Sequence, residues 1–439
     1  MTDRITVLGT GYLGATHATC LAELGFDVLG MDVDAEKIAA LSSGRLPFYE
    51  PDLEPLLRKH VELGNLRFTT SYAEAATFGE VHFLCVGTPQ RKGDDAADLT
   101  FLDAAVDGLA RHLERECLVV GKSTVPVGTA QRLARRIAGR APAGSATELA
   151  WNPEFLREGH AVEDTLRPER LVVGVRSERA ERVLREVYAK PIAAGTPFLV
   201  TDLATAELVK TAANAFLATK ISFINAMSEL CECAGADVVR LADAIGYDSR
   251  IGRQFLDAGV GFGGGCLPKD IRGFMARAAE LGAGRALRFL RDVDAINRRR
   301  RTRVVDLARE ACGGSFGGMR VGVLGAAFKP NSDDVRDSPA LGVATRIKRQ
   351  GAKVTVYDPR ANDNARRLFP ALAYTDSAVE ACTNARVVLH LTDWREFRTM
   401  DPTILDPIVA QKYIVDGRNA LDPDAWRRAG WIYRGLGRP

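Results

Sequence analysis

A glycine-rich segment that ends in a cysteine carries the residue types best suited to covalent chemistry. The segment, residues 259–270, reads GVGFGGGCLPKD, and its five glycines let the backbone approach a ligand closely. Pro268 suits the first turn of a helix, because proline has no N–H to leave unpaired there. Cys266 is therefore expected just before a helix N-terminus and beside Lys269, two features that lower the pKa of a thiol. With Asp270 one helical turn later, the segment predicts a reactive cysteine rather than an inert buried one.

Two further groups of polar residues stand where a site is expected. Lys210 and Asn214 are four residues apart in ELVKTAANAF, so they share one face of a helix that is otherwise apolar. A lysine on a buried face is costly unless it is paired or functional, and the alternative is a lysine at the helix edge that extends to solvent. Glu154 and Glu158 lie in NPEFLREG, which follows a predicted strand, the usual place for a site in α/β folds. A surface loop is the alternative for that segment.

A dinucleotide-binding pattern opens the chain. GTGYLG, residues 9–14, follows the strand-like run ITVL and begins a helical pattern, the context in which G-x-G-x-x-G predicts pyrophosphate binding at a helix N-terminus. A second strand ends at Asp32, whose carboxylate suits a ribose 2′-hydroxyl and repels a 2′-phosphate. The pattern therefore predicts NAD rather than NADP.

The last third of the chain carries a related but weaker pattern. Residues 321–329 read VGVLGAAFK, which lacks the full dinucleotide fingerprint, so a second NAD is not expected. A strand end followed by a glycine and by Lys329 suits a diphosphate, and a solvent-exposed Lys329 without function is the alternative.

The elements that must position these residues alternate between strand and helix in the first and last parts of the chain. Strands are predicted in ITVLG, DVLGMD, VHFLCVGTP, CLVVGKST, TELAWNPEF, RLVVGV, MRVGVLG, KVTVYDP, RVVLHLT and KYIVDGR. Such alternation favours parallel sheets covered on both faces. Between them, a helical pattern of about thirty residues begins near Thr201, and helix-like sequence continues to about Ala311. We predict an α/β protein in which two Rossmann-like parallel-sheet domains, residues 1–200 and 313–439, are joined by a central all-helical domain, residues 201–312.

Composition narrows the classes of partner. The 439 residues carry a formal charge of +3, too small to imply nucleic acid or a membrane surface, and no apolar run approaches the ~20 residues that span a bilayer. The eight cysteines are scattered, so we expect mostly buried thiols in a reducing cytoplasm and no metal site. The long central helix is expected to form a dimer surface. The run Arg298–Arg301 with Arg303 is expected to be a solvated helix face.

Combining a dinucleotide domain with an activated cysteine restricts the chemistry. Oxidation of an alcohol to an aldehyde needs no nucleophile, whereas oxidation onward to an acid does: the cysteine adds to the carbonyl, the adduct gives up hydride, and water cleaves the thioester. Together with a candidate diphosphate site, this predicts oxidation of a nucleotide-linked alcohol to a carboxylate.

At this point the chain resembles the UDP-glucose 6-dehydrogenase family of nucleotide-sugar dehydrogenases along nearly its whole length. The motifs that carry the resemblance are GTGYLG, FYEPDLEPLL, CVGTP, KSTVPVGT, NPEFLREG, ELVKTAANAFLATKISFIN, DSRIG, GFGGGCLPKD, FKPNSDDVRDSPA and VDGRN. The resemblance implies conversion of UDP-glucose, two NAD and water to UDP-glucuronate and two NADH, in a cytoplasmic homodimer or higher homo-oligomer.

The resemblance also implies roles for individual residues. Catalytic roles fall on Cys266 as nucleophile, on Lys210, Asp270 and Asn214 around sugar carbon six, and on Glu154 and Thr124 in thioester hydrolysis. NAD contacts fall on Gly9, Gly11, Tyr12, Leu13, Gly14, Asp32, Lys37, Thr88, Thr124, Glu158, Lys269 and Arg336. Nucleotide-sugar contacts fall on Glu154, Phe155, Leu156, Arg157, Glu158, Lys210, Asn214, Arg250, Phe255, Leu256, Asp257, Ala258, Gly259, Gly263, Lys329 and Arg418, with Arg250 reaching in from the neighbouring subunit.

Two departures from the family pattern bear on substrate preference. Gly265 stands where many members carry Ser or Tyr, and Leu267 stands where Phe is common in the UDP-glucose branch. The alternatives are the same chemistry on GDP-mannose, a UDP-N-acetylhexosamine or TDP-glucose, a two-electron hydroxyacid dehydrogenase, and an NAD-responsive binding protein.

Overall fold

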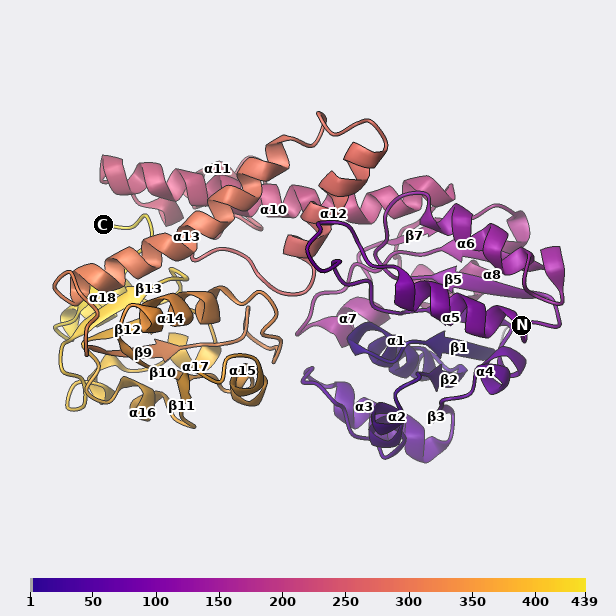
Figure 1. Ribbon diagram of the computed structural model, residues 1–439, viewed down its shortest axis with the longest axis horizontal. Helices are drawn as coiled ribbons and strands as arrows, with labels where there is room; N and C mark the ends of the chain where they lie inside the picture. Colours follow the sequence, from indigo (N-terminus) through magenta and orange to yellow (C-terminus); the bar gives the residue numbers. More distant parts are fainter. Residues whose placement is uncertain (1–2) are drawn as a thin grey trace. The chain divides into compact units, whose positions relative to one another are not determined.

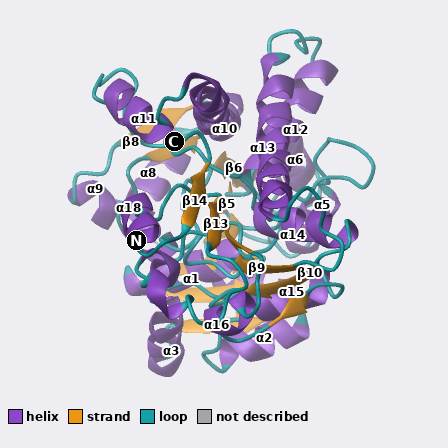
Figure 2. Ribbon diagram, turned by 90° about the vertical axis from the view of Figure 1, so that its left-hand side faces the viewer, coloured by secondary structure: helices purple, strands orange, loops and turns teal. Residues whose placement is uncertain are grey.

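The computed structural model describes residues 3–439 and divides the chain into two compact units. Unit 1 comprises residues 1–213 and 272–282, and unit 2 comprises residues 214–271 and 283–439. Each unit is built on one β-sheet with helices on both of its faces (Figures 1 and 2). The expected division into three domains, with its boundaries near 200 and 312, stays a prediction.

The sheet of unit 1 has eight strands in the order β3-β2-β1-β4-β5-β6-β7-β8. Its strands are β1 (Arg4–Leu8), β2 (Asp27–Met31), β3 (Leu66–Thr69), β4 (Val81–Leu84), β5 (Cys117–Gly121), β6 (Thr147–Trp151), β7 (Leu171–Gly174) and β8 (Phe198–Thr201). All neighbours run parallel except β6 and β7, which pair antiparallel through Trp151 and Gly174. The order of the first six strands is that of a dinucleotide-binding sheet, whose direction of winding reverses between β1 and β4.

In the described part of unit 1, nine α-helices connect these strands. They are α1 (Tyr12–Glu23), α2 (Ala35–Ser42), α3 (Leu53–Leu63), α4 (Tyr72–Phe78), α5 (Thr100–Ala110), α6 (Thr129–Ala138), α7 (Ala161–Leu166), α8 (Glu178–Val187) and α9 (Ala189–Ala193). The alternation predicted from the sequence is confirmed, and the short strands β3 and β8, which were not predicted, extend the sheet at its two edges.

The core of unit 1 follows from the period of two in a strand. Ile5 and Val7 of β1 point into one apolar cluster, whereas Leu8 points into the cluster on the other face. Because both faces are covered by helices, the strands are apolar along their length, which is why ITVL and CLVV read as continuous apolar runs.

The sheet of unit 2 has six parallel strands in the order β11-β10-β9-β12-β13-β14. The strands are β9 (Arg320–Leu324), β10 (Lys353–Tyr357), β11 (Ala373–Tyr374), β12 (Val387–His390), β13 (Tyr413–Asp416) and β14 (Ile432–Gly435). The helices of this unit are α11 (Val238–Gly246), α13 (Phe289–Ala311), α14 (Pro339–Arg349), α15 (Asn362–Leu368), α16 (Ala378–Cys382), α17 (Arg395–Arg398) and α18 (Pro423–Arg428). A second parallel α/β sheet is therefore confirmed.

Two further helices, α10 (Leu203–Ala234) and α12 (Leu267–Glu280), contain residues of both units. The long helix predicted from the sequence is α10, and the end predicted near Ala311 is the end of α13. The expectation that Arg298–Arg301 with Arg303 is a solvated face is wrong for two of the five arginines. Arg300 is fully buried against Ser228 and Glu232 of α10, and Arg301 is buried against Asp337.

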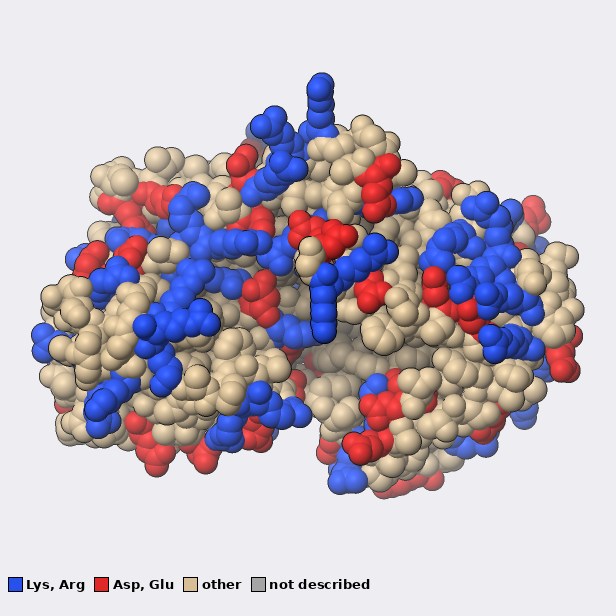
Figure 3. Space-filling model, viewed as in Figure 1, with Lys and Arg blue, Asp and Glu red and all other residues tan. Residues whose placement is uncertain are grey.

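Six of the eight cysteines are buried, which confirms the expectation for most of them, and Cys233 and Cys266 are exposed. Among residues 3–439, no helix combines the length and the apolar character needed to cross a membrane. On the face drawn in Figure 3, Lys and Arg side chains lie among Asp and Glu side chains. Ion pairs join such side chains within the described residues, for example Arg136 with Asp107.

Candidate active site

The first loop of unit 1 has the backbone shape that a pyrophosphate needs. Gly9 has a φ of +85°, and a Cβ at Gly14 would lie 1.8 Å from the carbonyl oxygen of Gly9, so neither position accepts a larger residue without rearrangement. Helix α1 begins at Tyr12, and no side chain caps its N-terminus. The amides at this end of α1 are therefore available to an anion, as the sequence predicted.

Asp32 follows β2 at the carboxyl edge of the sheet, where a ribose is expected. Its Oδ2 accepts hydrogen bonds from the amide of Thr10 at 2.8 Å and from Lys37 Nζ at 2.8 Å. Burial opposes the charged form, but Lys37 and the amides of Asp34 and Thr10 outweigh it and hold the pKa of Asp32 below its ordinary value. A fixed carboxylate beside an uncapped helix end fits NAD, whose binding site these residues would form.

Glu50 ties the cofactor loop to the loop that carries Glu154 and Glu158. Its carboxylate accepts a hydrogen bond from the Tyr12 hydroxyl and, at 2.7 Å each, from the amides of Gly159 and Ala161. Burial and this neighbouring carboxylate raise the pKa of Tyr12, so the phenol stays a donor. The sequence-based assignment did not include Glu50, although FYEPDLEPLL was among the family motifs.

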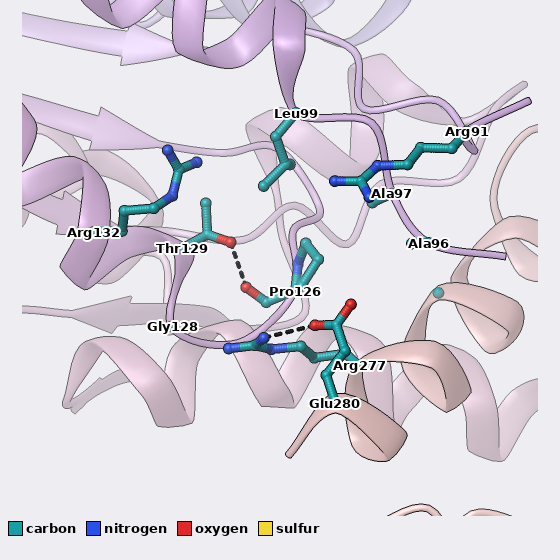
Figure 4. A pocket seen from close by; sticks show the side chains of 11 residues that line it. Arg91, Ala96, Ala97, Leu99, Pro126, Gly128, Thr129, Arg132, Arg277 and Glu280 are labelled. Atoms are coloured by element: carbon teal, nitrogen blue, oxygen red, sulfur yellow. Dashed lines mark hydrogen bonds and ion pairs between the residues drawn. The ribbon is translucent and has the colours of Figure 1, made fainter. Parts of the chain in front are cut away.

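The carboxyl ends of β4 and β5 bring Thr88 and Thr124 together. The Thr88 hydroxyl donates to the carbonyl oxygen of Thr124 at 2.6 Å. Beyond Thr124 a cavity of about 230 Å³ opens at the start of α6 (Figure 4). It is lined by Arg91, Ala96, Ala97, Leu99, Pro126, Gly128, Thr129, Arg132, Gly273, Arg277 and Glu280, none of which the sequence-based assignment included.

The N-terminus of α6 is capped by a carboxylate from α10. Glu207, only 2% exposed, accepts hydrogen bonds from the amides of Gly128 at 2.7 Å and Ala130 at 2.6 Å. Burial raises the pKa of Glu207 to about 7, against the opposing effect of those amides and of Arg277. This end of α6 is thus already occupied by a carboxyl group of the protein itself.

Glu154 is held by donors on both of its oxygens. Oε1 accepts from the amides of Phe155 at 2.8 Å and Leu156 at 3.0 Å, and Oε2 lies 2.9 Å from Nζ of the buried Lys122. On α10, Lys210 places its Nζ 5.4 Å from the centroid of the Phe155 ring. The structure therefore brings Lys210 to the loop that carries Glu154. Arg157 in the same loop is engaged by the Asp164 carboxylate through its backbone and its guanidinium.

In unit 2, the reactive-cysteine segment has the predicted local structure. Helix α12 begins at Leu267, and the amide of Asp270 donates to the carbonyl oxygen of Cys266 at 2.8 Å, so the exposed Cys266 precedes the helix N-terminus. The buried Asp270 accepts from Asn214 Nδ2 at 2.7 Å and from Lys269 Nζ at 2.7 Å. Four predicted residues, Cys266, Lys269, Asp270 and Asn214, therefore lie together.

Two asparagines shape the glycine-rich stretch in front of Cys266. Asn225 Oδ1 accepts from the amide of Gly259, and the Asn297 side chain bonds both the N–H and the carbonyl of Phe262. A Cβ at Gly261 would lie 2.4 Å from Asn297 Oδ1, so the close approach requires glycine. Neither asparagine was predicted, because each acts on a loop far away in the chain.

Gly265 lies against the side chain of Arg336. A Cβ at Gly265 would lie 2.3 Å from the guanidinium carbon of Arg336, and the Arg336 carbonyl accepts from the amide of Gly264. A serine or tyrosine at this position would therefore require the guanidinium, the end of a flexible side chain, to move. Arg336 also pairs with Asp334 at 2.6 Å.

In the second sheet, the loop after β9 differs from the loop after β1. Asp358, at the end of β10, accepts from the amides of Ala326 at 2.7 Å and Ala327 at 2.9 Å. Lys329 lies just beyond, with its Nζ 5.6 Å from the centroid of the Phe328 ring. A carboxylate accepts from an amide in both loops, since Asp32 accepts from Thr10 after β1, but the loop after β9 has no glycines corresponding to Gly11 and Gly14.

The remaining predicted nucleotide-sugar residues lie around the same glycine-rich stretch or on the surface. Arg418 donates to the carbonyl oxygens of Gly261, Phe328 and Leu391, which joins that stretch to two loops of the second sheet. Arg250 is exposed and pairs with Asp248 at 2.6 Å, away from these contacts. The other predicted residues of the segment differ in burial. Asp257 is exposed, Phe255 is half-buried, and the buried ones are Leu256, Ala258, Gly259 and Gly263.

Comparison with known proteins places this geometry in one family. Residues 3–192, 204–299 and 322–423 match, in order, the NAD binding domain, the central domain and the UDP binding domain of the UDP-glucose/GDP-mannose dehydrogenase family. The chain is 41% identical to a UDP-glucose 6-dehydrogenase of Rhizobium meliloti over 438 residues, covering 99% of this chain and 100% of that protein. It is also 41% identical to UDP-glucose 6-dehydrogenase TuaD of Bacillus subtilis, covering 99% and 93%.

Solved structures agree. A UDP-glucose dehydrogenase from Pyrobaculum islandicum superposes with a TM-score of 0.92 at 39% identity, covering 100% of this chain and 98% of that one. A UDP-D-ManNAc dehydrogenase from Pyrococcus horikoshii superposes with a TM-score of 0.86 at 29% identity, covering 99% of both chains. With three successive domain matches and full-length relatives of this identity, the chain belongs to the UDP-glucose/GDP-mannose dehydrogenase family of NAD-dependent oxidoreductases.

Proposed function

We propose that this protein oxidises UDP-glucose to UDP-glucuronate with two NAD and one water. The observation that carries the proposal is the exposed Cys266 in front of α12, with Asp270 one helical turn later and hydrogen-bonded to Asn214 of α10. A helix N-terminus favours the thiolate, which is the form that adds to an aldehyde. A cysteine in this position is what the second oxidation needs and the first does not.

The reaction divides into two hydride losses and one hydrolysis. Bound NAD supplies the hydride acceptor for each oxidation. The alcohol at sugar carbon six becomes an aldehyde, the Cys266 sulfur adds to it, and loss of a second hydride leaves a thioester. Water then adds to the thioester carbon, the carbon–sulfur bond breaks, and Cys266 leaves as the thiolate. The sum is four electrons to two NAD, with the acid as the product.

The polar residues around carbon six are assigned by the charge each step develops. Asn214 is an N–H donor and Lys210 a cation, so both suit the oxyanion that forms when sulfur or water adds to the carbonyl. Asp270 holds Asn214 in place through a 2.7 Å hydrogen bond. Glu154 is the base for the hydrolytic water, and Thr124 supports that step, as the family resemblance implies.

The nucleotide sugar is assigned to the glycine-rich stretch and the second sheet. Lys329 is assigned to the diphosphate, and Phe255 to Gly259 with Gly263 are assigned to contribute backbone that a sugar can approach closely. Arg418 donates to the carbonyl oxygen of Gly261 in the same stretch and to those of Phe328 and Leu391 in two loops of the second sheet. NAD is assigned to the residues of unit 1 around Gly11 and Asp32, and the family resemblance adds Lys269 and Arg336.

A homodimer is the second part of the proposal. Phe216, Phe223 and Leu230 of α10 recur every seven residues and are 67%, 49% and 60% exposed, so they form one apolar stripe along the helix. A second copy of the same helix supplies a matching stripe, which makes the interface self-complementary. The exposed Arg250 is then the residue offered to the partner's site. Buried thiols are typical of the reducing cytoplasm, to which we assign the protein.

The test is NADH formation with a panel of nucleotide sugars. We expect UDP-glucose to give two NADH per molecule consumed, ahead of UDP-N-acetylmannosamine, GDP-mannose and TDP-glucose. One NADH per substrate would indicate a two-electron dehydrogenase, and no turnover of UDP-glucose would overturn the proposed substrate. The panel matters because Gly265 and Leu267 depart from the common pattern of the UDP-glucose branch.

A further inference from the structure

Lys122 is a buried lysine that none of the roles above uses. It follows β5 directly, and its side chain is 3% exposed. A buried ammonium is costly unless it is paired and hydrogen-bonded. The Lys122 ammonium meets both conditions, because Nζ lies 2.9 Å from Glu154 Oε2 and 3.1 Å from Asn152 Oδ1.

The position of the ammonium is fixed from several elements at once. Asn152, after β6, is itself held by a hydrogen bond from its Nδ2 to the carbonyl oxygen of Val172 on β7. The Tyr188 hydroxyl, at the end of α8, donates to Asn152 Oδ1 at 2.6 Å. The rings of Phe83 on β4 and Tyr188 each lie 5.9 Å from Lys122 Nζ. Lys122 therefore has little freedom to leave Glu154.

Glu154 is in turn held at three points. Two backbone amides bind Oε1 and Lys122 binds Oε2, which fixes the rotation of the carboxylate. The Glu154 side chain is nevertheless 17% exposed, so part of it is accessible to solvent. An oriented carboxylate that water can reach is what a general base for water requires.

We propose that Lys122 is a positioning residue for thioester hydrolysis, which holds the Glu154 carboxylate in place and in its ionised form. In that step the water oxygen bonds to the thioester carbon, the carbon–sulfur bond breaks, and Glu154 takes one proton from the water. The inference rests on the proposed function, because it concerns a step of that reaction.

The charges around the pair support the same assignment. Burial by itself favours the neutral carboxyl, but Lys122 and the two amides lower the pKa of Glu154 below its ordinary value. Burial likewise opposes the Lys122 ammonium, and Glu154 outweighs it, so the pKa of Lys122 is raised.

Most of the other ionisable groups near this pair are uncharged near pH 7. They are His17 and Cys20 on α1, Cys85 after β4, Tyr188 after α8, and Lys210 on α10 over the Phe155 ring. Burial lowers the pKa of His17 and raises those of Cys20, Cys85 and Tyr188, so these four stay neutral near pH 7. Without Lys122, Glu154 would lose its paired cation and bind a proton at higher pH.

The experiment follows NADH in the full-length protein with UDP-glucose and NAD over a range of pH. For Lys122→Met we expect a burst of two NADH per subunit, a slow steady rate after it, and an acid limb of kcat moved up by about one to three pH units. Lys122→Arg, which keeps the charge, restores the position of that limb. Tyr188→Phe is the matched control: it removes a contact of Lys122 but not the ammonium, and its acid limb stays at the wild-type pH.

Outcomes separate this inference from the proposed function. Glu154→Gln is measured alongside. Suppose that Glu154→Gln stalls after the burst, while the acid limb of Lys122→Met coincides with that of the wild type. The role of Lys122 is then wrong, and the proposed function stands. If Glu154→Gln hydrolyses the thioester at the wild-type rate, the role of Glu154 is wrong and the inference falls with it. Should Lys122→Met not fold, judged by loss of NAD binding, Lys122→Gln is read by the same criterion.

Discussion

Replacing Glu207 by glutamine tests how the start of α6 is stabilised. The Glu207 carboxylate is 2% exposed and accepts hydrogen bonds from the amides of Gly128 and Ala130. Burial raises its pKa from 4.5 to about 7, so the folded protein binds this proton more tightly than the unfolded chain does. The stabilisation from the protonated form is fully present below the unfolded pKa and is lost as the pH rises through the folded pKa.

The size of the effect follows from the two pKa values. With 4.5 in the unfolded chain and about 7 in the folded protein, the wild type loses roughly 2 to 3 kcal/mol of stability from this group between pH 5 and pH 8. Glutamine does not titrate, so Glu207→Gln lacks this dependence. The variant is less stable by a pH-independent amount as well, because its amide offers one acceptor where the carboxylate binds two N–H groups.

Native-state hydrogen exchange of the Gly128 and Ala130 amides at pH 5 and pH 8 measures the opening free energy at this helix end. For each protein we take the change in this opening free energy between the two pH values, after correction for the intrinsic exchange rate. The change in the wild type is then compared with the change in Glu207→Gln. Glu280→Gln is the control, since Glu280 is a neighbouring but exposed acid in the same unit. We expect it to follow the wild type.

Equal changes in the wild type and in Glu207→Gln would refute the reasoning, because they would mean that Glu207 has the same pKa in both states. A wild type that becomes more stable as the pH rises, relative to the variant, would show that the amides and Arg277 outweigh burial.

Three further predictions concern the proposed function. Cys266→Ser is expected to lower kcat by about 10³-fold or more while the dissociation constant for NAD, measured by calorimetry, is unchanged; steady-state rates like those of the wild type would contradict its role as nucleophile. Asp32→Asn is expected to raise the dissociation constant for NAD by about 10- to 100-fold through loss of a charged acceptor, with nucleotide-sugar affinity unaffected. An equal loss of affinity for NAD and for the nucleotide sugar would contradict the assignment of NAD to unit 1. Phe223→Glu is expected to raise the dimer dissociation constant, measured by sedimentation velocity, by about 30-fold or more. The control is Val33→Glu, which changes an exposed residue outside α10. An unchanged mass distribution in Phe223→Glu would argue against the α10 stripe as the interface.

Much of the site could be predicted because its features are encoded within a few neighbouring residues. The turn at Gly9 to Gly14 needs glycine at particular positions, and the start of α12 is marked by Pro268, two residues after Cys266. The buried strands of both sheets were predicted because strands covered on both faces are apolar along their length. Edge strands lack that signal: in β8 no residue is fully buried, and β11 has two residues.

The sequence alone therefore determined the strand–helix alternation, the cofactor loop and the position of the cysteine, since backbone sterics and apolar periodicity act over a few residues. Tertiary structure decided which charges are buried. Lys122 and Glu154 are 32 residues apart in the sequence, and Arg300 meets Glu232 on another helix, so each cation had to find a distant partner. The sequence pattern around Arg300 favoured a solvated face because it contains no sign of that partner. A buried charge is stabilised only by the groups that the fold brings to it, and that information lies in the packing of the whole chain.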